Sequence, residues 1–291
     1  MILKIGSKGE QVKQLQRFLG LKDDGDFGPK TEAAVKKWQQ ENKLVVDGIV
    51  GRQTWNAMGL VTTDATDQNT ISDSVIIKQH YLPKGEYFDG PTKKQWVFIH
   101  HTAGWENPYN TINNWAKDTR GAIATEFVLG GQKVTNGDSK YDGEVVQAFP
   151  AGGYAWHLGT GNAPIHRNSV GIEVCNFGQV VNGKTYVGTE VHPTQLVTLK
   201  KPFRGFNVWH RYSDKQIEAL KDLILFIANR DNIDVRKGLP NLIRQKGADA
   251  FDVFDIKMCE NTPGLWSHTN VRKDKVDMFP QQELIDMLLS L

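Results

Sequence analysis

The segment 97–104, with the sequence VFIHHTAG, restricts the possible folds more than any other stretch of the chain. Such an apolar run is typical of a strand buried in a sheet, and here it leads directly into two histidines. One histidine at a strand end is more often a satisfied polar residue than a ligand, but His268 and Asp277 follow far downstream. Together with His100 they match the three protein ligands that a hydrolytic zinc site usually offers.

Two more charged residues stand where a catalytic site would use them. Lys275 precedes Asp277 by two positions, so in an extended segment their side chains point to the same side. Glu173 lies in the sequence SVGIEV at 169–174, where the valines and the isoleucine form the other face of a strand. A carboxylate in so apolar a strand is costly unless it is paired or used. We therefore expect Glu173 and Lys275 beside the metal ligands.

From residue 96 onward the chain resembles the zinc-dependent N-acetylmuramoyl-L-alanine amidases of the type-2 family, which are related to peptidoglycan recognition proteins and phage lysins. The resemblance rests on four motifs in the right order: the strand ending at His100, AWHLG at 155–159, NSVGIE at 168–173, and His268 followed by Lys275 and Asp277. It implies an α/β fold with a mixed β-sheet flanked by helices. It also implies a zinc ion held by His100, His268 and Asp277.

The resemblance implies roles for the residues around the metal. Zinc would lower the pKa of a water molecule toward ~7, and Glu173 would take its proton and return it to the leaving amine. Lys275 would neutralise the oxyanion that develops beside the metal. The bond cleaved would be the amide between the lactyl group of N-acetylmuramic acid and L-alanine.

Substrate contacts are expected from Trp156, His157 and Thr125. Thr125 stands where many relatives carry a catalytic tyrosine, so this chain departs from them there. His101 points away from His100 if the strand continues, and it is expected to be a core or supporting histidine.

Two cysteines occur, Cys175 and Cys259, so neither a disulfide framework nor a zinc knot of paired cysteines is expected. Cys175 follows an apolar strand and is expected to pack as a small hydrophobic residue. Cys259 is an alternative thiolate ligand in place of Asp277, although the family order puts the anionic ligand after the second histidine.

The stretch 178–267 is longer than in compact relatives, and its segment 200–212 has no counterpart in them. Two interpretations of this segment stay open. It is either part of the substrate groove or an insertion without a role.

The N-terminal region contains an internal repeat. DGDFGPKT at 24–31 is echoed by DGIVGRQT at 47–54, with a period of 23 residues. In each copy the Asp-Gly pair supplies a turn, the second glycine supplies a backbone that can take positive φ, and Pro29 suits a first helical turn. Apolar residues at helical spacing complete the pattern of a small three-helix bundle. It resembles the peptidoglycan-binding domains attached to wall hydrolases, and the alternative is a repeat that only builds the fold.

A chain of 291 residues is long enough for two domains. Residues 61–74 are rich in Thr, Asp, Asn and Ser and have no apolar period, which predicts a linker. The expected order is a wall-binding domain at 1–60, a linker at 61–74 and a zinc amidase domain at 75–291.

The 35 basic and 33 acidic residues leave a net charge of +2, which is too balanced to favour nucleic acid or anionic wall polymers. Affinity for peptidoglycan must then come from shaped contacts. The candidate sugar platforms are Trp38, Trp55, Trp105, Trp156, Trp209 and Trp266, and for Trp38 we favour core packing.

No window approaches the length of a membrane-spanning helix, so no membrane partner is expected. The N-terminus lacks the charged start and apolar run of a secretory signal. These features fit a monomeric phage lysin that is made in the host cytoplasm and reaches the wall after the membrane is breached. A host enzyme that lost its signal by cloning would look identical.

Strands are expected at 95–101, 124–129, 144–149 and 169–175, and helices at 110–117 and 213–232, the latter with a capping box from Ser213 to Gln216. Alternating strands and helices favour a mixed sheet with helices on its faces.

The same residues bear on two alternative functions. A recognition protein that only binds would lack the anionic ligand, so Asp277 and Lys275 favour hydrolysis. A zinc peptidase of the stem peptide uses similar ligands on another fold, and the order of the motifs argues against it.

Overall fold

The computed structural model describes residues 3–42, 44, 46, 48–50, 54, 55, 58, 75–159 and 163–291. The chain divides into two compact units, Met1–Asp73 and Ser74–Leu291. The linker expected at 61–74 lies outside the described residues.

The first unit contains α1 (Glu10–Phe18) and α2 (Pro29–Glu41). Both helices are amphipathic, and Val12, Leu15 and Val35 from their inner faces are buried in one shared core. Pro29 is the first residue of α2, as the sequence predicts. Most residues of the expected third helix lie outside the described part of the chain, although Thr54 and Trp55 are helical.

The 23-residue repeat has a structural counterpart in one hydrogen bond. The side-chain oxygen of Gln16 accepts from the amide of Gly25, and that of Gln39 accepts from the amide of Gly48, each at 2.9 Å. Both glycines have left-handed backbones, with φ of 74° and 75°. The prediction placed positive φ at the second glycine of each copy, and this is wrong for Gly28, whose φ is −94°. The Asp-Gly turn itself requires the left-handed residue, and Gly28 only leads into α2.

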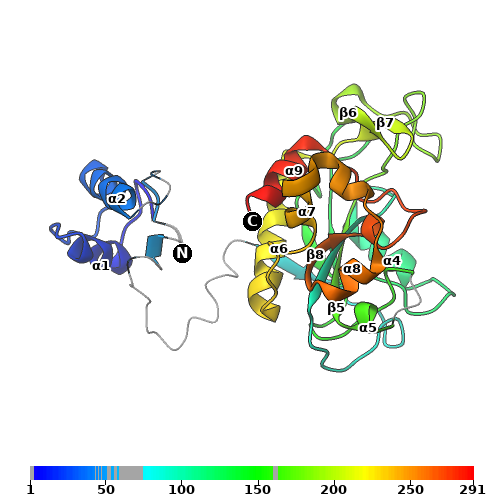
Figure 1. Ribbon diagram of the computed structural model, residues 1–291, viewed down its shortest axis with the longest axis horizontal. Helices are drawn as coiled ribbons and strands as arrows, with labels where there is room; N and C mark the ends of the chain where they lie inside the picture. Colours follow the sequence, from blue (N-terminus) through cyan, green and yellow to red (C-terminus); the bar gives the residue numbers. More distant parts are fainter. Residues whose placement is uncertain are drawn as a thin grey trace. The chain divides into compact units, whose positions relative to one another are not determined.

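A six-stranded sheet forms the centre of the second unit, in the order β1-β4-β3-β5-β2-β8 (Figure 1). Its strands are β1 (Ile77–Gln79), β2 (Trp96–His101), β3 (Phe127–Leu129), β4 (Val145–Gln147), β5 (Ser169–Val174) and β8 (Gly264–Ser267). β3 and β4 are antiparallel and the other neighbours are parallel, so the sheet is mixed as expected. The four expected strands correspond to β2, β3, β4 and β5.

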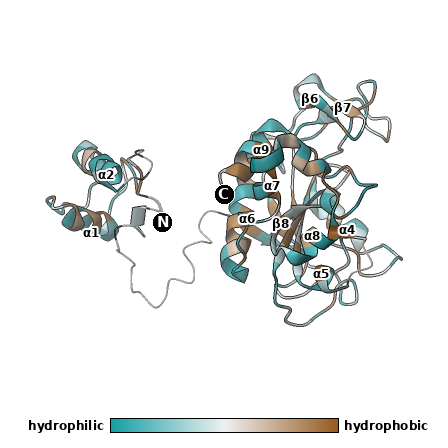
Figure 2. Ribbon diagram, viewed as in Figure 1, coloured by the Kyte–Doolittle hydropathy of each residue, from teal (hydrophilic) through white to brown (hydrophobic). Residues whose placement is uncertain are grey.

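Helices cover this sheet. They are α4 (Pro108–Trp115), α5 (Ala163–Arg167), α6 (Asp214–Asp231), α7 (Leu239–Lys246), α8 (Ile256–Asn261) and α9 (Gln282–Leu289), with 3₁₀ turns at Pro193–Gln195, Gly247–Asp252 and His268–Asn270. The capping box predicted for α6 is present, because Ser213 and Gln216 exchange both bonds. Figure 2 shows hydrophobic residues concentrated in the central strands, where α6, α7 and α9 contribute to the largest buried core. No helix in the described part of the chain is both long and apolar enough to cross a membrane.

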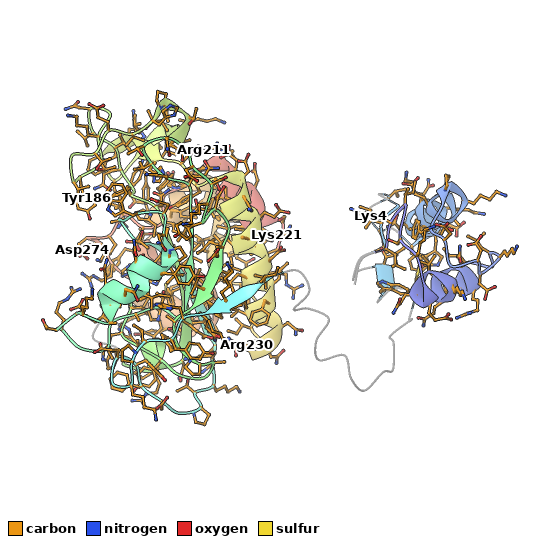
Figure 3. The ribbon with its side chains drawn as sticks, turned by 180° about the vertical axis from the view of Figure 1, so that it is seen from behind. Lys4, Tyr186, Arg211, Lys221, Arg230 and Asp274 are labelled. Atoms are coloured by element: carbon orange, nitrogen blue, oxygen red, sulfur yellow. The ribbon has the colours of Figure 1, made fainter. Side chains whose placement is uncertain are left out.

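The segment without a counterpart in compact relatives forms a two-stranded hairpin. Its strands are β6 (Leu196–Phe203) and β7 (Phe206–His210), which the strand predictions did not include. Upstream of it lies Tyr186, which is exposed at the surface (Figure 3). The Tyr186 hydroxyl donates to the carbonyl of Ala103 at 2.9 Å, so this region contacts the loop that follows β2.

Candidate metal centre

The sheet brings the first two predicted ligands to one edge. β2 lies between β5 and β8 and is parallel to both, so the carboxyl ends of these three strands lie together. His100 is in register with Glu173 on β5, and Ile99 with Ser267 on β8. His268 follows Ser267 directly and begins a 3₁₀ turn, which places its ring beside His100.

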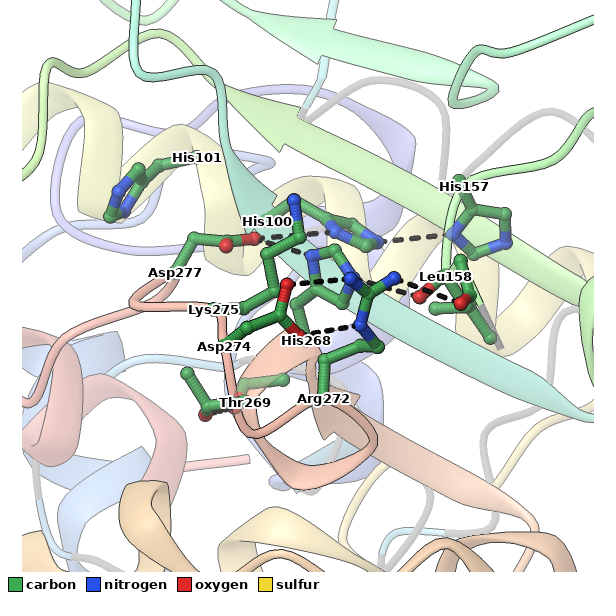
Figure 4. A network of polar contacts seen from close by, with 12 residues as sticks. His100, His101, His157, Leu158, His268, Thr269, Arg272, Asp274, Lys275 and Asp277 are labelled. Atoms are coloured by element: carbon green, nitrogen blue, oxygen red, sulfur yellow. Dashed lines mark hydrogen bonds and ion pairs between the residues drawn. The ribbon is translucent and has the colours of Figure 1, made fainter. Parts of the chain in front are cut away.

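The third predicted ligand arrives on the loop after this turn. Ligand atoms of His100, His268 and Asp277 all lie within 4.8 Å of one another. One carboxylate oxygen of Asp277 is 2.8 Å from Nδ1 of His268 and 3.4 Å from Nδ1 of His100 (Figure 4). All three side chains are buried. The structure therefore brings together the three side chains that the sequence predicts as ligands.

The hydrogen-bond network assigns the tautomer of His268. Its Nε2 lies 3.0 Å from the carbonyl oxygen of Leu158. A carbonyl only accepts, so Nε2 carries the hydrogen and donates it. In the neutral ring Nδ1 is then left with a lone pair that faces Asp277.

A chain of three polar residues assigns the tautomer of His100 in the same way. The Ser169 hydroxyl donates to the carbonyl of His166 at 3.1 Å, so its oxygen accepts from Nε2 of His157 at 2.8 Å. Nδ1 of His157 must then accept from Nε2 of His100, which is 3.0 Å away. This leaves the lone pair on Nδ1 of His100, the nitrogen that faces Asp277.

Two nitrogen lone pairs thus point at one carboxylate oxygen. An acceptor 2.8 Å from another acceptor is stable only with a proton or a metal cation between them. Burial, followed by the charge of His268, lowers the pKa of His100 to about 4, so its ring is neutral at neutral pH. Burial by itself would raise the pKa of Asp277, but the neighbouring His268 and His100 lower it. Two imidazoles and one carboxylate are a ligand set that suits zinc.

Glu173 and Lys275 lie beside the cluster. Burial raises the pKa of Glu173 well above its usual value, the charge of Asp277 raises it further, and the charge of Lys275 opposes both. Lys275 also lowers the pKa of His100. Figure 4 shows the Lys275 side chain extending from its loop toward His100. Both predicted catalytic residues are therefore within electrostatic range of the three ligands.

The glycine in the strand SVGIEV, Gly171, leaves space for the ring of His157. A Cβ at this position would lie 2.7 Å from Cγ2 of Thr125 and 3.1 Å from Nδ1 of His157. Ser169, Gly171 and Glu173 alternate along β5 and share one face. The glycine gives the His157 ring the space that it needs between Ser169 and His100.

The three predicted substrate contacts have different environments. Thr125 is 1% exposed and its hydroxyl donates to the carbonyl of Phe127 at 2.9 Å, so in this conformation it is not open to a ligand. His157 is held by His100 and Ser169. Trp156 is partly exposed and packs edge-on against Phe88. Trp156 and His157 are both partly exposed, so of the three only Thr125 has no surface that a substrate could reach.

The tryptophans differ in the same way. Trp209 and Trp266 are 0% and 1% exposed, so the idea that they are sugar platforms is wrong: both fill the core of the second unit. Trp38 packs against the core of the first unit, as favoured from the sequence. Trp55 is also buried, whereas Trp105 is 45% exposed.

The remaining ligand alternatives lie outside the cluster. His101 points away from it in Figure 4, and its Nδ1 is 2.9 Å from the hydroxyl of Tyr212, as expected for a supporting histidine. Cys175 and Cys259 are both buried, and burial raises the pKa of each thiol. Sγ of Cys259 donates to the carbonyl of Asn270 at 3.8 Å, and among the described residues the ligand cluster contains no cysteine.

Sequence reasoning missed two groups at this site. Ser169 shares a strand face with Glu173, so strand alternation could have predicted that it faces the site. Arg204 lies 64 positions before His268, and its guanidinium donates to carbonyls of the loop that carries Lys275. The Arg-Gly pair between two strand-like runs indicates a hairpin, but nothing in the sequence indicates where its turn packs.

Two protein-family models match the chain. One, described as N-acetylmuramoyl-L-alanine amidase, matches residues 90–274, and one for a peptidoglycan binding domain matches residues 8–58. The amidase match covers more than half of the chain and includes His100, Glu173 and His268. It ends before Lys275 and Asp277, so the assignment of these two residues depends on the geometry above.

Curated relatives match over shorter stretches. The chain is 38% identical over 102 residues to the N-acetylmuramoyl-L-alanine amidase XlyB of Bacillus subtilis (strain 168), which is 34% of this chain and 32% of that protein. It is 47% identical over 62 residues to the zinc D-Ala-D-Ala carboxypeptidase of Streptomyces albus G, which is 19% of this chain and 24% of that protein. The chain thus spans less than a third of the length of either relative.

Solved structures also match. The endolysin of Burkholderia phage AP3 is 36% identical, with a TM-score of 0.20, over 20% of this chain and 24% of that chain. The structure of PlyL is 15% identical, with a TM-score of 0.37, over 67% of this chain and 81% of that chain.

Proposed function

The chain belongs to the N-acetylmuramoyl-L-alanine amidase family, and we propose that it hydrolyses the amide bond between N-acetylmuramic acid and L-alanine in bacterial peptidoglycan. The observation that carries this proposal is the convergence of Nδ1 of His100, Nδ1 of His268 and a carboxylate oxygen of Asp277 at the carboxyl edge of the sheet. This donor set would hold a zinc ion, as in other hydrolytic sites with three protein ligands. When bound, zinc supplies Lewis acidity that polarises a carbonyl group and makes water a stronger nucleophile near neutral pH.

Glu173 is proposed as the proton carrier. Its carboxylate is in register with His100 and partly buried, and burial raises its pKa. A carboxylate with a raised pKa accepts a proton from the attacking water and can donate the same proton to the nitrogen of the leaving L-alanine. The peptide then leaves as an amine, and the lactyl group of the sugar becomes a carboxylate.

Lys275 is proposed to stabilise the charge that develops on the carbonyl oxygen. Its ammonium is close enough to affect the pKa of both Glu173 and His100. A fixed cation stabilises a transition state in which the oxygen becomes negative more than it stabilises the neutral amide.

We further propose that the first unit binds peptidoglycan and that the protein acts as a monomeric phage endolysin made in the host cytoplasm. The match of residues 8–58 to a peptidoglycan binding domain supports the first part. Trp156, partly exposed beside His157, is the proposed substrate contact on the second unit.

Digestion of purified peptidoglycan tests the activity. Wild-type protein is expected to release intact stem peptides that begin with L-alanine, identified by mass, together with glycan strands that keep their lactyl carboxylates. Protein stripped of metal by a chelator should release none, and added zinc should restore release. Fragments cut inside the stem peptide would point to a peptidase. Binding to peptidoglycan without any release by the zinc-loaded protein would point to a recognition protein.

A further inference from the structure

A two-residue turn joins the strands of the β6–β7 hairpin. Phe203 and Phe206 pair across it, and the two residues between them have left-handed backbones, with φ of 49° at Arg204 and 88° at Gly205. Two left-handed residues form the tight turn that joins twisted antiparallel strands. Glycine adopts this conformation freely, but a residue with a Cβ adopts it at a cost. Contacts of the Arg204 side chain help to offset this cost.

The Arg204 side chain reaches the loop that follows His268. Nη2 donates to the carbonyl of Thr269 at 3.2 Å, and Nη1 donates to the carbonyls of Arg272 and Lys273 at 3.1 Å each and to that of Lys275. The loop thus turns four carbonyl oxygens toward one guanidinium. Carbonyl oxygens that lie so close together repel one another unless a cation with several N–H groups lies between them. Arginine supplies five N–H groups.

The Nε group of Arg204 makes a further contact, with an acidic side chain. Nε donates to a carboxylate oxygen of Asp252 at 2.9 Å. The Arg204 side chain is 11% exposed and that of Asp252 is 59% exposed, so the ion pair lies at the surface. An exposed pair contributes little by itself, and the four carbonyl contacts are the main interaction of Arg204.

The hairpin region also holds the segment beyond Asp277. Phe279 stacks between Trp209 and Tyr212, with ring centroids 4.5 and 4.4 Å apart. The side chain of Gln281 accepts from the backbone amide of Tyr212 and donates to its carbonyl, at 2.8 and 2.9 Å. The loop with Lys275 and Asp277 is therefore attached to the same hairpin on both sides.

We propose that Arg204 is a positioning residue that sets the conformation of loop 269–275 and thereby the place of the Lys275 ammonium at the metal centre. The segment 200–212 then has a role that is neither groove nor inert insertion: its turn sets the shape of the loop that carries Lys275. This inference depends on the proposed function only for the role of Lys275, and the shape of the loop can be tested without any activity.

The test compares Arg204→Ala with Lys201→Ala. Lys201 is on β6, the strand that leads into this turn, and pairs with Asp249 at the surface, where both side chains are more than 60% exposed. Lys201→Ala therefore removes one cation without touching the loop. Hydrogen exchange at the amides of 269–276 is expected to be at least 10-fold faster in Arg204→Ala and unchanged in Lys201→Ala. Equal exchange in wild type and Arg204→Ala would overturn the proposal, whether or not the protein cleaves peptidoglycan.

Kinetics test the link to Lys275. We expect Arg204→Ala to lower kcat by about 10- to 100-fold with KM and zinc content nearly unchanged, because small displacements of a reacting group have effects of this size. The double variant with Lys275→Ala should be no slower than Lys275→Ala by itself. Losses that multiply in the double variant would contradict a role through Lys275. If Arg204→Ala does not fold, Arg204→Lys serves instead: it keeps the charge but cannot reach four carbonyls, and wild-type kcat and exchange in that variant would reject the proposal.

Discussion

The candidate metal centre has two sides that are built in different ways. His100 and Glu173 lie on adjacent strands of the sheet, and the backbone ladder between β2 and β5 sets their register. Lys275 and Asp277 lie on a loop without such a ladder, and the side chains of Arg204, Phe279 and their neighbours hold it. The strand side is fixed by main-chain pairing, whereas the loop side depends on contacts from residues that are 65 to 71 positions away in the sequence.

This difference determines how each side should respond to substitution. On the strand side a change acts locally, because the backbone of β2 and β5 stays paired. On the loop side a change can move several groups together, because few main-chain bonds oppose it.

Asp277→Ala should have the largest effect. It removes the only anionic ligand of the cluster and leaves two buried imidazoles facing each other, so we expect loss of bound zinc and activity no higher than that of chelator-treated protein. Asp274→Ala is the matched control, because Asp274 is on the same loop but exposed and paired with Arg272. Zinc content by metal analysis and release of stem peptides measure the effect. Retained zinc in Asp277→Ala would exclude Asp277 as a ligand.

Glu173→Gln tests the strand side at the same centre. The substitution keeps the size of the side chain and removes its ability to accept a proton, so turnover should fall by roughly 10²-fold or more. Zinc affinity should stay within a few-fold of wild type, because Glu173 is not one of the three ligands. Zinc titration and kcat on purified peptidoglycan separate the two effects. Normal turnover would remove Glu173 from the mechanism.

His157→Phe and His157→Gln test the chain that sets the tautomer of His100. Phenylalanine cannot accept the hydrogen of Nε2, so zinc affinity should fall by about 10- to 100-fold, as for other groups that orient a ligand. Glutamine has a carbonyl oxygen that can accept, and it should restore part of the loss. Competition with a chromogenic chelator measures the zinc dissociation constant of each variant. Equal affinity in wild type and His157→Phe would mean that the ring of His157 does not orient His100.

Gly171→Ala should destabilise the strand side without changing any ligand. The new Cβ would lie 2.7 Å from Cγ2 of Thr125 and 3.1 Å from the His157 ring. Overpacking of this kind costs about 1–3 kcal/mol in the free energy of unfolding. Denaturant unfolding measures it, and the shift of the His157 ring should also weaken zinc binding. An unchanged midpoint with unchanged zinc affinity would show that the pocket around Gly171 is not tight.

Lys94 lies before the start of β2, and its burial predicts a small effect of pH on stability. Its ammonium is buried and donates to the carbonyls of Gly153 and Arg167, and burial lowers its pKa from 10.5 to about 8. Between these values the unfolded chain binds more protons, so the free energy of unfolding rises with pH across that window. The free energy of unfolding of wild type minus that of Lys94→Met should therefore rise by about 1–2 kcal/mol between pH 8 and pH 10. If this difference did not change with pH, Lys94 would keep its usual pKa in the folded protein.

The sequence predicted the strand side well because the information there is local. Apolar runs that end in His100 and contain Glu173 correspond to β2 and β5, and strand alternation gives the face of each side chain. The capping box at Ser213 was equally local. The left-handed residue of the repeat was misplaced, at Gly28 instead of Gly25, because two glycines in one turn compete for that position.

The loop side could not be predicted from local patterns. Asp277 and Lys275 were placed by their spacing and by resemblance, but the contacts that hold them come from Arg204 and Tyr212, whose partners lie 65 to 71 residues away. Trp209 and Trp266 were misjudged for the same reason, since burial of an aromatic ring depends on tertiary packing. The contact between His157 and His100 was not predicted, because the loop that carries His157 has no periodic pattern to indicate where its side chains point.

The most direct test of the metal centre is anomalous diffraction at the zinc edge from crystals grown with zinc. A single strong peak is expected in the second unit, about 2.0–2.2 Å from Nδ1 of His100, Nδ1 of His268 and a carboxylate oxygen of Asp277. A peak bound through Nε2 of His100, or one at Cys259 or His157 with Asp277 unbound, would contradict both the ligand set and the hydrogen-bond chain that orients it.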